Sequence, residues 1–107
     1  MPYDQGLDDR LNAAVAGWGT TRRKMFGGTC NLINGNMMCG VYEDSLILRL
    51  GEEEGRVALG QPGVRPMNIT GRAMKGWVMV EQAGLSDEAL ARWLDKARRY
   101  AESLPPK

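Results

Sequence analysis

The chain of 107 residues is the size of one ordinary domain, and its 43% hydrophobic and 25% charged residues are typical of a globular protein. The 14 Lys and Arg residues against 13 Asp and Glu residues give a net charge of +1, which argues against a strongly basic nucleic-acid-binding domain and against electrostatic attachment to a membrane. No apolar run approaches the roughly 20 residues of a membrane span, and the N-terminus lacks a signal-peptide pattern. We therefore expect one cytoplasmic domain over residues 1–107, with free thiols at its two cysteines.

The first predicted element is a helix over residues 4–16. Asp4 is suited to cap it, and Asp8 and Asp9 lie near the positive end of the helix dipole. Four apolar residues recur at helical spacing: Leu7, Leu11, Val15 and Trp18. After this helix, the basic segment Arg22–Lys24 is interpreted as a short connector.

A β-hairpin is predicted over residues 25–41, because Asn34-Gly35 is a strong signal for a two-residue turn. With those two residues as the loop, Leu32 faces Met37 and Cys30 faces Cys39. One face of the hairpin is then entirely apolar: Cys30, Leu32, Met37, Cys39 and Val41. The other face is mixed: Asn31, Ile33, Asn36 and Met38.

The hairpin continues through a tight turn at Glu43-Asp44 into a strand over Ser45–Leu50, which completes a three-stranded antiparallel meander. The side chains of this strand alternate, with Leu46, Leu48 and Leu50 on one face and Ser45, Ile47 and Arg49 on the other. A short helix over Glu52–Leu59 follows, with acidic residues at its start and Gly60 as its end.

The next residues alternate between loops and short strands. We predict a loop over Gln61–Pro66, a short strand over Met67–Thr70, a turn over Gly71–Gly76 and a second strand over Trp77–Glu81. The resulting sheet has five strands.

The last helix is the most clearly marked element. Ser86 can cap it, and Leu85 and Leu90 can pack together across that cap. Its apolar stripe contains six residues: Leu90, Trp93, Leu94, Ala97, Ala101 and Leu104. The element order is thus α-β-β-β-α-β-β-α. It predicts an α+β, two-layer domain in which an antiparallel five-stranded sheet packs against three helices.

Several segments together resemble the TfoX N-terminal domain family. These are Lys24-Met25-Phe26-Gly27-Gly28, Asn34-Gly35-Asn36-Met37, Arg65-Pro66-Met67, Thr70-Gly71-Arg72, Met74-Lys75-Gly76-Trp77 and Leu104-Pro105-Pro106-Lys107. The resemblance covers about residues 3–107. It implies a compact α+β domain of the secretion-chaperone-like kind, of bacterial origin and similar to regulators of natural competence. It also implies a regulatory or interaction role rather than an enzyme activity.

The chain contains no histidine, which removes the commonest general base and the commonest zinc ligand. The carboxylates lie where helix starts favour acids: Asp8, Asp9, Glu52, Glu53, Glu54, Asp87 and Glu88. We therefore interpret them as solvated surface groups, predict no catalytic residues and no cofactor, and expect a protein that is not an enzyme.

Cys30 and Cys39 form the first candidate site. Facing cysteines in an antiparallel pair can approach closely enough for a disulfide, and the nearby methionines would suit a soft Cu(I) ion. The favoured interpretation is that both thiols are small core residues, so no metal site is predicted.

Arg65, Arg72 and Lys75 form the second candidate site. They bring three cations close together around a glycine-containing turn that could bind a small anion. The alternative is that Arg72 and Lys75 pair with local carboxylates and that the glycines serve turn geometry.

Two basic groups, Arg22–Lys24 and Lys96 with Arg98 and Arg99, are the only features that suggest nucleic-acid binding. The low net charge and the lack of a helix-turn-helix signature make direct recognition of nucleic acid an unfavoured hypothesis. Met38 and Ile33, on the mixed face of the hairpin, could instead form a surface for a protein partner or for a homodimer. Our first expectation is a non-enzymatic regulatory or protein-interaction domain. The alternative is a protein that binds a small anion or a soft metal.

Overall fold

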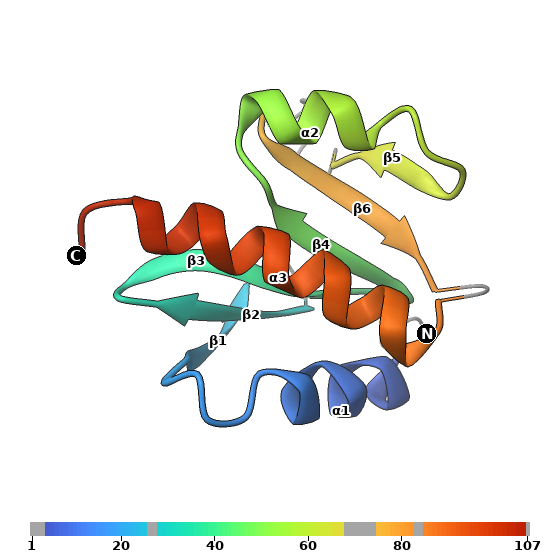
Figure 1. Ribbon diagram of the computed structural model, residues 1–107. Coiled ribbons are helices and arrows are strands. Elements are labelled where there is room, and N and C mark those ends of the chain that lie inside the picture. The colour runs from blue at the N-terminus through green and yellow to red at the C-terminus, as the bar shows by residue number, and fades with distance from the viewer. Residues whose placement is uncertain (1–3, 26–27, 68–74, 83–84, 107) are drawn as a thin grey trace.

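The computed structural model describes residues 4–25, 28–67, 75–82 and 85–106. Within them the chain forms three helices and six strands (Figure 1). In chain order these are α1 (Gln5–Ala14), β1 (Thr21–Met25), β2 (Gly28–Ile33), β3 (Asn36–Tyr42), β4 (Ser45–Arg49), α2 (Glu52–Ala58), β5 (Val64–Pro66), β6 (Trp77–Glu81) and α3 (Asp87–Ser103). The predicted α+β class is confirmed.

All six strands belong to one antiparallel sheet with the order β1-β2-β3-β4-β6-β5. The predicted number of five strands is therefore wrong by one. The additional strand is β1, which contains the Arg22–Lys24 segment that the sequence pattern suggested was a connector. As an edge strand, β1 shows no apolar alternation, and charged side chains on an edge discourage pairing with other chains.

Helices α1 and α3 pack on the same face of the sheet, and α2 lies beside β6 and β5 at the opposite end from α1 (Figure 1). Asp4 caps α1 by accepting a hydrogen bond from the Leu7 amide at 2.9 Å, and Ser86 caps α3 by accepting one from the Ala89 amide at 3.1 Å. Both caps confirm the predictions. The predicted stripes supply the core between helices and sheet: Leu7, Leu11, Val15, Leu90, Trp93, Leu94, Ala97 and Ala101 are all buried.

The Asn34-Gly35 hairpin is confirmed, and Leu32 pairs with Met37 as predicted. Beyond that pair the register shifts, because Asn31 pairs with Cys39 and leaves Met38 as the extra residue of a β-bulge. The bulge turns Cys39 to the face that packs against the helices, while Cys30 lies in a separate apolar cluster with Ile47, Met67 and Trp77. The predicted facing of the two cysteines is therefore wrong.

The bulge also corrects the interpretation of the mixed face of the hairpin. Met38 and Ile33 are buried in the core under the helices, so they do not form a partner surface. The first strand after α2 is β5, located within the predicted loop, and its Val64 pairs with Val80 of β6. Pro66 is tolerated there because β5 is an edge strand. Most of the predicted strand over 67–70 lies outside the described residues.

Three further predictions are confirmed, whereas most of the predicted turn over Gly71–Gly76 lies outside the described residues. Glu43-Asp44 forms the turn between β3 and β4, α2 begins at Glu52, and β6 has the predicted bounds. Among the described residues, no helix has the length and apolar character needed to cross a membrane.

Candidate functional site

The predicted anion site is only partly within the described residues, because Arg72 lies outside them. Arg65 is exposed on β5, and its guanidinium lies 3.8 Å from the carboxylate of Glu81 on β6. It lines a small hollow with Asp44, while Lys75 lines a different hollow beside α2. The described geometry therefore gives Arg65 a local carboxylate partner and does not bring it together with Lys75.

Both cysteines are buried free thiols. Cys30 pairs with Gly40 rather than with Cys39. Burial raises the pKa of the Cys30 thiol to about 11, and burial also raises the pKa of Cys39 well above its ordinary value. Within the described residues there is no group of three or more Cys, Asp or Glu side chains placed to hold a metal ion. Two thiols that stay protonated in separate apolar clusters behave as core residues.

Most of the basic residues that suggested nucleic-acid binding have carboxylate partners. The four pairs are Arg22–Asp8, Lys96–Glu54, Arg98–Glu102 and Arg99–Asp95. The Arg98 guanidinium also lies 4.6 Å from the centroid of the Trp18 ring, a cation–π distance. These contacts explain the positions of the cations without a bound polyanion.

Asp8 differs from the other acids at helix starts, because its side chain is only 2% exposed. It accepts a hydrogen bond from the Arg22 guanidinium at 2.5 Å and one from the Thr29 hydroxyl at 3.2 Å. The interpretation of Asp8 as a solvated surface group is therefore wrong. The other acids named with it are exposed as expected. Since Arg22 lies on β1 and Thr29 on β2, the Asp8 carboxylate fastens α1 to the edge of the sheet.

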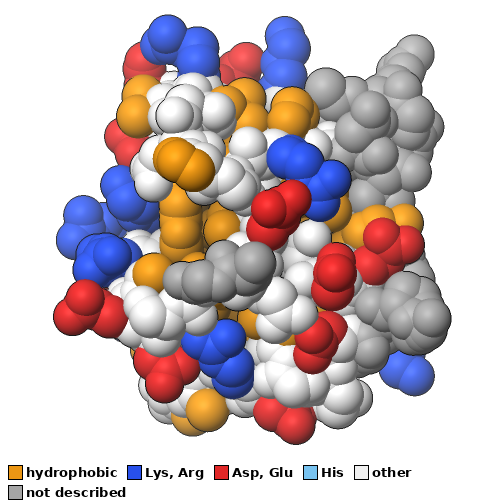
Figure 2. All heavy atoms as spheres, turned by 90° about the vertical axis from the view of Figure 1, so that its right-hand side faces the viewer, with side chains coloured by type: hydrophobic (Ala, Val, Ile, Leu, Met, Phe, Trp, Pro, Cys, Tyr) orange, Lys and Arg blue, Asp and Glu red, His pale blue; other side chains and the backbone are white. Residues whose placement is uncertain are grey.

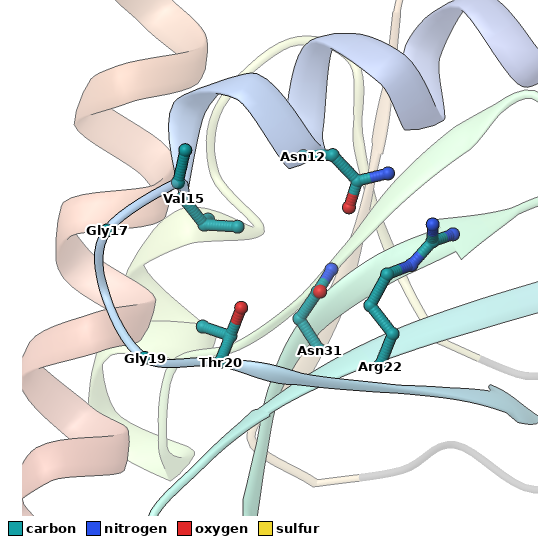
Figure 3. Close-up of a pocket in the computed structure, with 8 residues that line it drawn as sticks. Asn12, Val15, Gly17, Gly19, Thr20, Arg22 and Asn31 are labelled. Atoms are coloured by element: carbon teal, nitrogen blue, oxygen red, sulfur yellow. The ribbon is translucent and has the colours of Figure 1, made fainter.

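A hollow of about 650 Å³ opens next to this ion pair, between the end of α1, the connection to β1 and the first two strands. Its polar lining comes from three elements, because Asn12 extends from α1, Thr20 precedes β1, and Arg22 and Asn31 lie opposite each other on β1 and β2 (Figure 3). Val15 adds an apolar wall. The volume is within the range of small-molecule pockets, about 300–1,000 Å³.

Asn31 is the unusual residue of this hollow. Its side chain is fully buried, and neither its amide nitrogen nor its carbonyl oxygen has a hydrogen-bond partner among the described residues. An unpaired buried polar atom costs about 1–3 kcal/mol, so a buried amide without a partner calls for a physical explanation. Figure 3 shows this amide directed towards α1 and the side chain of Asn12.

A second hollow, of about 320 Å³, lies along α2 and is lined mainly by apolar groups, including Leu59, Pro66 and Trp77. Glycines allow α2 to approach the start of β6 closely, since a Cβ at Gly55 would lie 3.3 Å from the Cα of Gly76. The hollow is also lined by three charged residues, Glu52, Arg56 and Lys75.

The two most exposed large apolar side chains of the described residues, Val57 and Leu59, are on or next to α2, with exposed fractions of 60% and 40%. Figure 2 shows hydrophobic side chains together with cationic and acidic ones at the top of the molecule, where Figure 1 places α2. We call Val57, Leu59 and this hollow the α2 surface.

Asp8, Arg22 and Asn31 were not among the predicted site residues. One signal for Asn31 was present in the sequence, namely a carboxamide side chain between the apolar residues Cys30 and Leu32. For Asp8 and Arg22 no local signal distinguished them from neighbouring Asp9 and Arg23.

Comparison with known proteins gives one result. A sequence model described as the TfoX N-terminal domain matches residues 14–101. No curated protein and no solved structure matches the chain significantly.

Proposed function

Since the chain belongs to the TfoX N-terminal domain family, we propose that it is a non-enzymatic regulatory domain that acts by binding a partner protein through the α2 surface. The observation that carries this proposal is the exposure of Leu59 in the wall of an apolar hollow, with the exposed Val57 on the same helix. Single exposed apolar residues are common on monomeric proteins. An apolar hollow with an exposed apolar residue in its wall is what a protein interface uses to seat an anchoring side chain.

The charges around the hollow indicate the chemistry of the partner. Arg56 already pairs with Glu53 at 2.8 Å, whereas Lys75 is exposed and has no ion pair with another described residue. The matching partner segment would place an apolar side chain in the hollow and a carboxylate next to it, opposite Lys75. Burial of the apolar surface would supply most of the affinity, and the exposed ion pair would mainly set orientation.

The α2 surface can be tested with a double variant, Val57→Glu with Leu59→Glu. Both side chains are exposed, so the variant should fold as the wild type does. Ala91→Glu is the matched control, because Ala91 is exposed on α3, away from the hollow. The three proteins are immobilised at equal density, lysate of the source organism is passed over each, and the retained proteins are quantified by mass spectrometry. Sedimentation velocity of each purified protein measures self-association.

The proposal predicts a protein retained by the wild type and by Ala91→Glu but lost from the double variant. If the partner is a second copy of the chain, a dimer should become a monomer in the double variant only. Equal retention by all three proteins, together with an unchanged sedimentation coefficient, would contradict the proposal.

A further inference from the structure

Two buried asparagines on neighbouring strands differ in one respect. Asn36 on β3 is almost fully buried, and its amide donates a hydrogen bond to the Pro105 carbonyl at 3.0 Å, which ties the chain end to the sheet. Asn31 on β2 is fully buried, and no described residue pairs with either end of its amide. Asn36 therefore has a structural partner, whereas the side-chain amide of Asn31 is directed towards a hollow.

The charge of this hollow is balanced within the protein. Arg22 brings one cation to the wall, and the buried carboxylate of Asp8 neutralises it at 2.5 Å. The other polar groups of the wall are uncharged: the amides of Asn12 and Asn31 and the hydroxyl of Thr20. A ligand held here meets donors and acceptors in similar numbers, which favours an uncharged molecule over an anion or a cation.

The shape of the Asn31 side chain further limits the kinds of ligand that the hollow can bind. A carboxamide presents one acceptor and one donor side by side in a plane. Its best partner is a planar group that offers the complementary donor and acceptor on adjacent atoms, as the edge of a nucleobase or a lactam does. Val15 supplies an apolar wall for such a ring, and the guanidinium of Arg22 is itself planar.

We propose that the hollow between α1 and the β1–β2 edge binds a small, uncharged, planar molecule of the nucleobase or lactam type, with Asn31 as its bidentate partner. Thr20 and Arg22 border the same ligand, and Asn12 covers it from α1 (Figure 3). Asn12 and Arg22 are partly exposed, so their side chains can turn to admit the ligand to the buried amide. This site is separate from the α2 surface and does not depend on the proposed partner protein.

A direct test follows the side-chain amide signals of ¹⁵N-labelled protein during titration with single probes: adenosine, cytidine, uridine, nicotinamide and 2-pyrrolidone. Inorganic phosphate is added in a separate titration as the charged comparison. At least one planar probe should shift the Asn31 signal in a saturable way, whereas phosphate should not.

Two variants separate binding from structure. Asn31→Leu keeps the branching of the side chain but removes its donor and acceptor, so affinity for the active probe should fall by roughly tenfold or more. Its melting temperature should not fall, because the Asn31 side chain has no hydrogen bond to any residue that the structure describes. Asn36→Leu is the matched control, and it should melt at a lower temperature and bind the probe as the wild type does. Thr20→Val provides a second test at the rim, with a severalfold loss of affinity expected.

Two results would overturn the proposal. One is the absence of a saturable shift of the Asn31 signal with every planar probe at millimolar concentration. The other is probe binding by Asn31→Leu equal to that of the wild type.

Discussion

Replacement of Asp8 by alanine tests whether the buried ion pair holds α1 on the sheet. The change removes a charged acceptor that is 2% exposed and that receives hydrogen bonds from Arg22 and Thr29. Removing one partner of a buried pair costs about 3–5 kcal/mol. Arg22 is 44% exposed and can turn its guanidinium to water, which reduces this cost. We expect the free energy of unfolding to fall by about 2–3 kcal/mol.

Chemical denaturation of the purified domain measures this loss, and thermal unfolding should show it as a drop of about 8–12 °C. Asp9→Ala is the matched control, because Asp9 is the next residue of the same helix, is exposed, and has a single hydrogen bond to another described side chain, that of Gln5 at 3.0 Å. Its expected cost is below about 0.5 kcal/mol.

A double-mutant cycle with Arg22→Ala completes the test. Because each single variant leaves the other partner without its counter-charge, the double variant should lose less stability than the sum of the two. If Asp8→Ala costs no more than Asp9→Ala, the carboxylate is not an anchor, and its position reflects only the preference of helix starts for acids.

Three further outcomes are expected. Cys30 and Cys39 should resist alkylation in the folded protein at pH 8 and form no disulfide, because burial raises the pKa of both thiols. Rapid labelling of either thiol, measured by mass spectrometry, would contradict this expectation. A hydrogen bond from the Gln82 side chain and another from the backbone hold the pKa of Asp4 below its usual range. The ionised Asp4 carboxylate should therefore stabilise the fold fully above about pH 4, and this contribution should be lost as the pH falls through the lowered pKa of the folded protein. In the Asp4→Asn variant, the melting temperature should fall less steeply at acidic pH than it does in the wild type. Gly40→Ala should lower the free energy of unfolding by about 3 kcal/mol, since a Cβ there would lie 2.0 Å from a carbonyl oxygen of β2. A loss of less than about 0.5 kcal/mol would refute that geometry.

The parts of the fold that follow from local chemistry were predictable. The turn at Asn34-Gly35, the caps Asp4 and Ser86 and the bounds of β6 each depend on residues a few positions apart. The β-bulge at Met38 was not predictable, because an inserted residue that is itself apolar leaves the alternation of apolar side chains plausible in either register. The strand β1 was missed for a related reason, since an exposed edge strand has no buried face to show a pattern.

The candidate site depends on contacts that sequence spacing does not reveal. Asp8 meets Arg22, 14 residues away, and Thr29, 21 residues away, only after α1 has folded against the sheet. Before that, Asp8 and Asp9 are neighbouring acids near the start of one helix, and the helix dipole is a sufficient explanation for both. The position of Asn31 in a strand was predictable, but the lack of a partner for its amide is a property of the packed structure alone.

The α2 surface and the Asn31 hollow lie at opposite edges of the sheet, next to β5 and β1 respectively (Figure 1). With neighbouring strands about 4.8 Å apart, the α2 surface and the Asn31 hollow do not adjoin each other. Helix α3 is the element that reaches both regions, because Lys96 pairs with Glu54 of α2 at 3.6 Å and Arg98 stacks on Trp18, which follows α1. An exposed ion pair and a surface cation–π contact are worth at most about 1 kcal/mol each. Coupling carried by these two contacts is therefore limited to about 2 kcal/mol, which corresponds to a change in affinity of roughly thirtyfold.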